Sequence, residues 1–320
     1  MNFTASSALD MDGFVRALIH SVSSNLGSDV EITTSEQKKN NQITYPCLTI
    51  RHPDRNISPN IRLDELFDTY KNGNMNLEEI TERISSAYNS IDRKSLKFEN
   101  IISDPEKISD KIFYRLVNYE RNCETLETYP HFRILDLAVV FCIYVPLPNE
   151  ETGSVRIDDK IAKLLGFDAG KLLALAVKNT PAIFPTSFED LDDLLVRIMK
   201  KRGVPDHMIP LFMNNGGFHS PMKVLTNDQS YYGASCILYP GVLENIRKDL
   251  GHDLYIIPSS VNEVIILPAS TIDAEHLNEM VKDVNSTVIP PDQILSDNIY
   301  RYPHDFGPEV IGPFTAAASK

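Results

Sequence analysis

The stretch that most constrains this chain is "RILDLAVVFCIYV", Arg133 to Val145, in which apolar residues rich in β-branched and aromatic side chains follow one another. Such a run predicts a buried β-strand. The longest apolar stretch, "ILDLAVVFCIYVPL", is shorter than the roughly 20 residues that cross a bilayer, and it contains Asp136. We therefore expect a strand in the core of a globular protein and no membrane span.

The composition supports a globular core and argues against several classes of partner. Hydrophobic residues make up 42% of the 320 positions, which is enough apolar surface for a core and disfavours global disorder. The 44 acidic and 31 basic residues give a formal net charge of −13. Nucleic acid binding depends on Lys and Arg replacing counterions, so this charge has the wrong sign for DNA, RNA or an anionic membrane. We expect a protein or small-molecule partner whose identity the sequence does not give.

The cysteines predict no metal site, and no glycine-rich loop predicts a cofactor. Cys47, Cys123, Cys142 and Cys236 are scattered, and none belongs to the short-spaced pair that brings thiolates onto one zinc ion. Four isolated thiols in a chain of this length fit the reducing cytosol. The first residues, "MNFTASSALDMDGF", lack the basic and apolar segments of a signal peptide, so we expect a cytoplasmic protein.

The periodicity of the chain predicts an α+β fold made of several parts. These are an N-terminal part over 1–100, a central part over 101–203, a linker over 204–221, a C-terminal module over 222–303 and a tail over 304–320. The linker carries three prolines and the pair Gly216-Gly217, which are strong signals for irregular structure.

The N-terminal part is predicted to be a helix, a β-hairpin and two further helices. Apolar residues at helical spacing precede Gly27, which ends the first helix. "DVEITTSEQ" and "QITYPCLTIRH" form the hairpin around a polar turn. Ser58 and Pro59 begin the next helix, and Asn76 caps the last one, with Glu79 three positions on as in a capping box.

The central part is predicted to be helical with a short sheet. "DPEKISDKIFYRLVNYERNCETLETYP" has the pattern of a mostly helical segment, on which Arg115 and Tyr119 share a face and stack. The buried strand follows, and "SVRID" pairs back with it. Two helices complete this part: Pro181 ends or kinks the first, and Ser187 caps the second.

The C-terminal module is predicted to have the order ββαββα. Its strands are "MKVLTN", "YYGASCILY", "DLYIIPS" and "VIILPA", and its helices are "PGVLENIRKDLG" and "DAEHLNEMVKDVNS". Strands as continuously apolar as these are not left bare on both sides. We therefore expect four strands in one sheet with both helices on one face.

Several stretches also carry a resemblance to a known family. They include "NISPNIRLDE" (56–65), "LVNYERN" (116–122), "PHFRILDLAVV" (130–140), "NTP" (179–181), "VLTN" (224–227), "YGASCILYPGVLE" (232–244), "DLYIIPSSVNEVIILP" (253–268) and "LSDNIY" (295–300). Over nearly its whole length, the chain resembles a bacterial domain-of-unknown-function family, number 5688. The resemblance implies no activity. Asn262 stands where the family pattern usually has His, which argues against a role for that imidazole as a base in this chain.

Ser235 and Cys236 in "GASC" are the residues most similar to a nucleophile motif. A nucleophile elbow has the pattern G-x-S-x-G, and Ile237 replaces its second glycine here. The turn comes later, at Pro240-Gly241, so we expect Ser235 and Cys236 inside a strand and inert. Pro240 suits the first turn of a helix, and Gly241 permits a backbone with positive φ.

Two polar sets are the candidate binding residues. His131, Arg133 and Asp136 in "PHFRILD" form the densest polar group beside an apolar strand, and a buried Arg133–Asp136 network or a ligand pocket would each explain them. Ser259, Ser260, Asn262 and Glu263 in "PSSVNE" are either turn formers or polar ligand contacts at one sheet edge.

The absence of a complete catalytic, metal or cofactor motif favours a non-catalytic binding or regulatory protein. Two alternatives remain open. One is an enzyme, such as a hydrolase, whose site is assembled from several segments, because catalytic residues converge in space and not in sequence. The other is a component of a host-defence or mobile-element system that acts through protein contacts. A deep pocket joining "PHFRILD" and "PSSVNE" would favour the enzyme.

Overall fold

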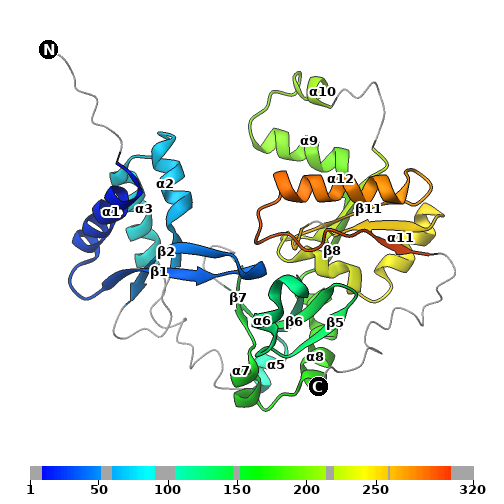
Figure 1. Cartoon of the computed structure of the whole chain (residues 1–320), viewed down its shortest axis with the longest axis horizontal. Coiled ribbons are helices and arrows are strands. Elements are labelled where there is room, and N and C mark those ends of the chain that lie inside the picture. The colour runs from blue at the N-terminus through cyan, green and yellow to red at the C-terminus, as the bar shows by residue number, and fades with distance from the viewer. Residues whose placement is uncertain are drawn as a thin grey trace. The chain divides into compact units, whose positions relative to one another are not determined.

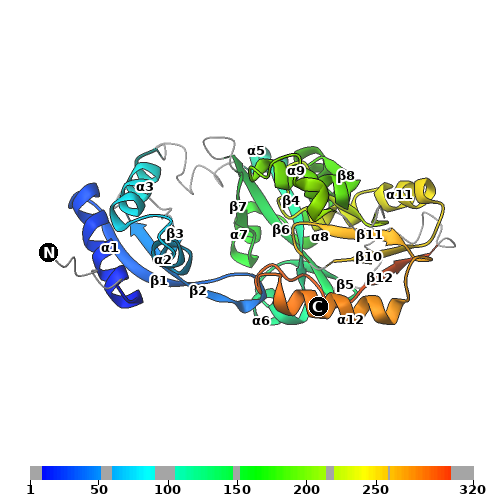
Figure 2. The same ribbon diagram turned by 90° about the horizontal axis from the view of Figure 1, so that it is seen from above.

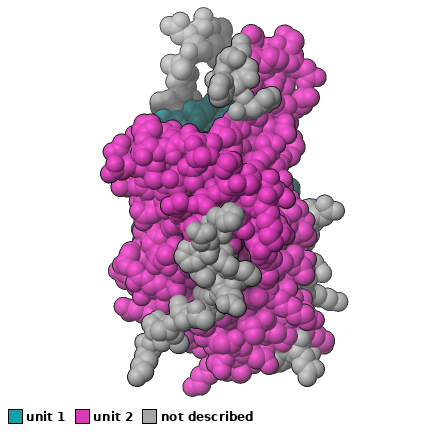
Figure 3. All heavy atoms as spheres, turned by 90° about the vertical axis from the view of Figure 1, so that its right-hand side faces the viewer, with its two compact units in different colours: residues 1–105 teal, residues 106–320 magenta. Residues whose placement is uncertain are grey.

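The computed structural model describes residues 9–51, 60–90, 105–146, 152–213, 220–258 and 260–303. The chain divides into two compact units, residues 1–105 and residues 106–320 (Figures 1 and 3). Each unit combines helices with antiparallel sheet. The predicted α+β fold class is therefore confirmed at this level, and the arrangement of its elements differs from the prediction in several places.

The first unit contains the predicted hairpin between helices. Its elements are α1 (Met11–Leu26), β1 (Glu31–Lys38), η1 (Asn40–Gln42), β2 (Thr44–Arg51), β3 (Asn60–Arg62), α2 (Leu63–Lys71) and α3 (Leu77–Ser90). Gly27 ends α1. Asn76 and Glu79 form the predicted capping box, since each side chain accepts a hydrogen bond from the backbone N–H of the other. The short strand β3 was not predicted, and Ser58 and Pro59 lie outside the described residues.

The first unit has its own hydrophobic core. Phe14, Leu18 and Val22 line one face of α1 at helical spacing and are fully buried. They pack in one cluster with Leu48 of β2 and Ile80 of α3. Helices α1 and α3 thereby cover one side of the hairpin.

The second unit begins with a sheet built around the predicted buried strand. Its elements are α5 (Pro105–Ser109), β4 (Ile112–Asn118), η2 (Glu120–Asn122), α6 (Cys123–Leu126), β5 (His131–Ile134), β6 (Leu137–Pro146) and β7 (Thr152–Arg156). Strand β6 pairs with β4 along one edge, and with β5 and then β7 along the other. The predicted pairing of "SVRID" with the buried strand is confirmed, since β7 pairs with β6.

The prediction that 104–130 is mostly helical was wrong, because β4 crosses the middle of this segment. All seven residues of β4 are buried. A strand buried on both faces loses its alternation, so a periodicity argument does not separate it from a buried helix.

Helix α8 (Ala169–Ile183), which follows α7 (Asp159–Leu165), protects the free edge of β4. Asn179 donates hydrogen bonds to the carbonyl oxygens of Ser109 and Ile112, at 2.7 and 3.1 Å. Thr180 Oγ1 accepts one from the backbone N–H of Tyr114 at 3.1 Å. These side chains satisfy backbone groups that an unprotected edge strand leaves open. Pro181 lies inside α8, which ends two residues later, as predicted.

The rest of the second unit forms a five-stranded antiparallel sheet in the order β12-β10-β11-β9-β8. Its elements are β8 (Thr186–Asp190), α9 (Leu191–Lys201), α10 (Ile209–Phe212), β9 (Lys223–Asn227), η4 (Gly233–Leu238), α11 (Val242–Leu250), β10 (Leu254–Ile257), β11 (Val264–Pro268), α12 (Ala274–Thr287) and β12 (Tyr300–Tyr302). Strand β8, from before the 204–221 segment, pairs with β9, from after it. Ser187 lies within β8, so the prediction that it caps a helix was wrong; Asp190 holds the N-cap position of α9.

The predicted strand at 231–239 was also wrong. Tyr232 has φ 51°, which breaks the extended conformation, and Gly233–Leu238 form the 3-10 helix η4. Residues 233–237 are all buried, so the apolar run reflects burial on every side of a short helix. Gly241 has φ 77°, so its predicted positive φ is confirmed.

The helices of this module cover opposite faces of the sheet, so the prediction of one shared face was wrong (Figure 2). Helix α12 packs on the face that carries Ile257 and Leu267. Ile256 points the other way by strand alternation and shares a pocket with Leu243 of α11. The sheet is thus a central layer, covered on both sides.

Candidate functional site

A pocket of about 190 Å³ opens in the second unit on the face of the five-stranded sheet opposite to α12. Its walls are almost entirely aliphatic and aromatic. They come from β4, the β5–β6 hairpin, η4, α11, β10 and β12, and consist of Leu116, Ile134, Leu135, Leu137, Ile237, Leu238, Leu243, Ile256, Tyr300, Arg301 and Tyr302. The pocket is therefore suited to an apolar group.

Leu135, at the tip of the β5–β6 turn, is the least usual residue of this pocket. Its side chain is 66% exposed although it is large and apolar. Its backbone has φ 55°, a left-handed conformation that residues other than glycine, asparagine and aspartate seldom adopt. Conformations of this kind cost roughly 1–3 kcal/mol and are concentrated at binding and catalytic sites.

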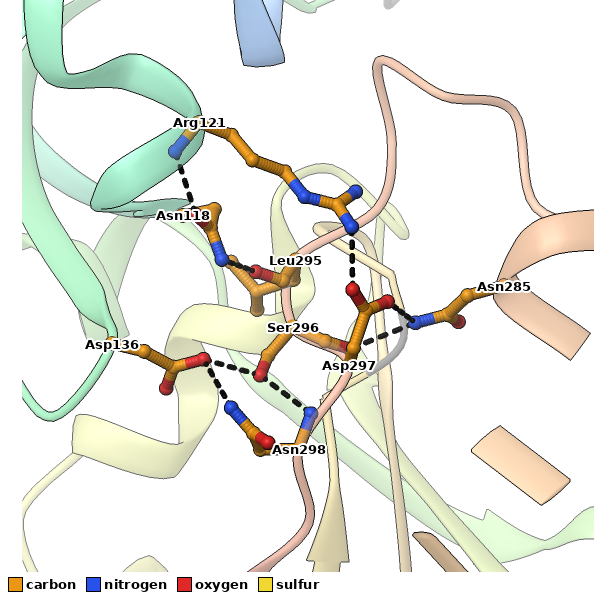
Figure 4. Close-up of polar contacts among 8 residues, drawn as sticks. All are labelled: Asn118, Arg121, Asp136, Asn285, Leu295, Ser296, Asp297 and Asn298. Atoms are coloured by element: carbon orange, nitrogen blue, oxygen red, sulfur yellow. Dashed lines mark hydrogen bonds and ion pairs between the residues drawn. The ribbon is translucent and has the colours of Figure 1, made fainter. Parts of the chain in front are cut away.

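Asp136, the other residue of that turn, anchors the segment that carries the far wall of the pocket. Its Oδ2 accepts hydrogen bonds from Ser296 Oγ at 2.6 Å and from Asn298 Nδ2 at 3.1 Å (Figure 4). Its Oδ1 accepts one from the Tyr300 hydroxyl at 2.5 Å. Tyr300 therefore belongs to both the polar network and the pocket wall.

The hydrogen bonds around Asp136 set the protonation states of Asp136 and Tyr300. Burial pushes the pKa of Asp136 upward, but the hydrogen bonds from Ser296, Tyr300 and Asn298 outweigh it, and the pKa lies below its usual value. Burial raises the pKa of Tyr300, and the bond to Asp136 acts in the same direction. At neutral pH an ionised carboxylate thus accepts a bond from a neutral phenol.

The segment from Leu295 to Asn298 is also held from three further elements, β4, η2 and α12 (Figure 4). Asn118, at the end of β4, donates to the Leu295 carbonyl oxygen at 3.0 Å. Arg121 pairs with Asp297 at 2.5 Å. Asn285 of α12 donates to the Ser296 carbonyl oxygen at 2.8 Å and to Asp297 at 2.9 Å. These contacts fix the approach to β12, which contributes Tyr300 to the pocket.

His131 and Arg133 lie on β5 and make separate contacts. The ring Nδ1 of His131 lies 2.9 Å from the Tyr129 carbonyl oxygen. Arg133 pairs with Glu120 at 3.2 Å and stacks 4.0 Å from the centre of the Tyr119 ring. The predicted Arg133–Asp136 network was wrong for the described residues, because the hairpin turn sends the two side chains to different partners.

Residues 260–263 form a turn that does not line the pocket. Ser260 pairs with Ile294 in an isolated bridge, and its hydroxyl accepts from the backbone N–H of Asn262 at 3.0 Å. Burial raises the pKa of Glu263, and a hydrogen bond with Ser260 opposes this shift. Ser259 lies outside the described residues. The segment from Ile294 to Ser296 runs between this turn and Asp136, so the two predicted sets meet the same segment without sharing the pocket.

The serine and cysteine of η4 are both buried. Ser235 is buried, and its hydroxyl has no hydrogen-bond partner among the described residues. The Cys236 thiol donates to the Thr226 carbonyl oxygen, and burial raises its pKa to about 12. In the described ranges, no group of three or more His, Cys, Asp or Glu side chains is placed to hold a metal ion. Each helix in those ranges is too short or too polar to cross a bilayer.

The network residues come from stretches that also carry a family resemblance. A family of unknown function, DUF5688, matches the chain over residues 11–304. The chain belongs to this family. No curated protein matches the chain, and no solved structure matches it. In this DUF5688 member, "LVNYERN", "PHFRILDLAVV" and "LSDNIY" meet at the Asp136 network.

Sequence reasoning singled out Asp136 and missed its partners. Ser296, Asn298 and Tyr300 lie 160 to 164 residues away along the chain. The available signal is the "LSDNIY" stretch, which carries part of the family resemblance and contains all three partners.

Proposed function

We propose that the protein is a non-catalytic binding protein that takes one apolar group of a ligand or partner into the pocket behind Leu135. The main support for this proposal is Leu135. An exposed leucine in a left-handed conformation at a pocket rim lowers the stability of the folded protein. A polar residue in that turn would relieve the strain and the exposure together. Contact with a bound apolar group would offset this cost of a leucine at the rim.

The size of the pocket supports a single ring or branched aliphatic group. An apolar cavity of about 150 Å³ holds one benzene molecule. The pocket here, at about 190 Å³, is slightly larger. An apolar anchor side chain or a small hydrophobic molecule of this size is the kind of group that dominates binding energy when it fills such a recess.

The bordering polar groups favour binding over catalysis. The Tyr300 hydroxyl bonds to Asp136, and the Arg301 guanidinium bonds to Asp253 at 2.5 Å. A general acid or base needs a proton position directed at the substrate. Asp136 acts in this proposal as a positioning residue for Tyr300.

The four unpaired thiols support a cytoplasmic setting.

The experiment compares Leu135→Asn with the wild-type protein. Asparagine tolerates the left-handed conformation, so the melting temperature without ligand should stay equal or rise. Saturating benzene, toluene or indole should raise the melting temperature of the wild type, because a ligand bound only to the folded state stabilises it. The variant should lose most of this response.

Leu164→Asn is the matched control, since Leu164 is 63% exposed on α7, away from the pocket. It should keep the full response to the same compounds. An equal response in Leu135→Asn and Leu164→Asn, or no response in the wild type, would contradict the proposed function.

A further inference from the structure

Arg115, in the middle of β4, is a buried cation that pairs with no carboxylate of the described residues. Only 6% of its surface is exposed. Its Cζ lies 4.4 Å from the centre of the Tyr232 ring. Among the described residues its Nε has no hydrogen-bond partner, and its guanidinium makes no ion pair. The charge is therefore desolvated and faces an aromatic ring, with no counter-ion in the described part of the chain.

Other arginines of the second unit show the opposite arrangement. Arg121, Arg133, Arg197 and Arg301 are each paired with a carboxylate, although their side chains are 34% to 64% exposed. An exposed cation needs a partner least, because water solvates it, whereas a buried cation needs one most. The four exposed arginines thus have carboxylate partners that contribute little. Arg115, for which charge burial costs most, has no such partner among the described residues.

The strand register places further donors on the face of the sheet that carries Arg115. Arg115 pairs with Val140, which also pairs with His131 of β5. Two positions along β6, Cys142 pairs with Arg156 of β7. These residues project from one face by strand alternation. Burial raises the pKa of the Cys142 thiol, and the charges of Arg115 and Arg156 both oppose that shift, so both guanidinium groups lie near it.

His131 adds a second buried nitrogen without a partner. Its Nδ1 contacts the Tyr129 carbonyl oxygen, so Nδ1 carries a proton. Its Nε2 is buried and has no partner among the described residues. Arg156 stacks 5.6 Å from the centre of the Tyr129 ring. Two arginines and an imidazole thus share a face on which the structure describes no carboxylate bound to Arg115 or Arg156.

A strained segment covers this face. Ser230 and Tyr232 both have φ 51°, and the ring centres of Tyr231 and Tyr232 are 4.4 Å apart. The Tyr231 hydroxyl lies 2.8 Å from Ser154 Oγ on β7. Two left-handed residues other than glycine within three positions are costly, and such strain is concentrated at ligand sites.

We propose that this face of the sheet binds a small organic anion through a phosphate or carboxylate group held between Arg115 and Arg156, with His131 beside it and Tyr232 as a wall. The planar guanidinium group pairs with two oxygens of such an anion at once. The anion supplies the counter-charge that Arg115 lacks. Leu116 points to the opposite side of β4, so this site is separate from the apolar pocket and does not depend on its function.

The test measures the melting temperature in inorganic phosphate, in acetate and in chloride at matched ionic strength. Phosphate or acetate should stabilise the wild type more than chloride does, with a saturating dependence on concentration. Arg115→Met should melt higher than the wild type in chloride, because it removes an uncompensated buried charge. The same variant should lose the specific response to the anion.

Arg197→Met is the control, because it removes one charge from an arginine that is 64% exposed and lies on α9. It should keep the response. Arg156→Gln is a second variant that decides the result if Arg115→Met fails to fold. Loss of the melting-temperature response to phosphate or acetate in Arg156→Gln supports the anion site. An unchanged response overturns the proposal. A wild type that responds equally to all three salts also overturns the proposal, and Arg115 is then a structural cation stacked on Tyr232.

Discussion

Gly233 and Ser235 lie in the same buried 3-10 helix, and replacing each by alanine should have different effects on stability. A Cβ on Gly233 would collide with Thr226 Oγ1 and the Asn262 carbonyl oxygen. Thr226 Oγ1 already donates to that carbonyl oxygen at 2.7 Å, so neither atom is free to move. We expect Gly233→Ala to lower the free energy of unfolding by about 3 kcal/mol, as overpacking does at its upper range.

Ser235→Ala should be neutral or slightly stabilising. The Ser235 hydroxyl is buried without a hydrogen-bond partner among the described residues, so its removal relieves a desolvated polar group. Urea unfolding of the two variants and the wild type checks both effects. A loss of more than about 1 kcal/mol in Ser235→Ala would contradict this prediction.

At the scale of elements, the junction between the β5–β6 turn and the 295–300 segment depends on one carboxylate. Asp136→Asn keeps the shape of the side chain and removes the charge that accepts bonds from Ser296 and Tyr300. Hydrogen bonds to charged groups contribute about 1.5–3 kcal/mol each. We expect a loss of roughly 2 kcal/mol at pH 7, discounted because Asp136 is only half-buried.

The pH dependence of this loss has a defined sign. The folded-state pKa of Asp136 is lower than its ordinary value, so its stabilising effect is present above the unfolded-state pKa of about 3.9 and disappears as pH falls through the folded-state value. The stability difference between the wild type and Asp136→Asn, followed from pH 7 to pH 3, should therefore begin to shrink below about pH 4. Curves that stay parallel over this range would show that the carboxylate charge does not hold the junction.

Elements whose signals are local could be predicted from the sequence, and elements defined by distant partners could not. Asn76 and Glu79 interact across three positions, so the capping box was visible in the sequence. The sequence pattern predicts a helix where β4 lies, because the identity of β4 depends on pairing with β6 and on Asn179 and Thr180, which bond to it from 67 and 66 residues away. Segment 231–239 has the composition of a strand. The left-handed backbone of Tyr232 and the close contacts of Gly233, which the composition does not show, accompany its 3-10 helix.

The candidate site follows the same rule. Asp136 is visible locally because it stands with His131 and Arg133 in a dense polar group beside an apolar strand. The pocket beside it needs β4, the β5–β6 hairpin, α11 and β12 together, which are spread over nearly 190 positions from Leu116 to Tyr302. No periodicity within one segment contains that information.

At the scale of the whole molecule, the two units each have their own core. Ile80 packs in a cluster drawn from residues 11–88, and Cys142 packs in a cluster drawn from residues 113–232. Units with independent cores unfold as separate cooperative transitions unless a large apolar interface couples them. We therefore expect calorimetry to resolve two transitions in the intact chain.

Ile80→Ala and Ile143→Ala form a matched pair that assigns these transitions. Both isoleucines are fully buried, one in α3 of the first unit and one in β6 of the second. Each substitution should cost about 2–5 kcal/mol within its own unit. Ile80→Ala should shift one transition to lower temperature by roughly 10 °C or more and leave the other in place, while Ile143→Ala should do the reverse. If both variants shifted one common transition, the units would unfold as a single cooperative body, and their separate cores would not be independently stable.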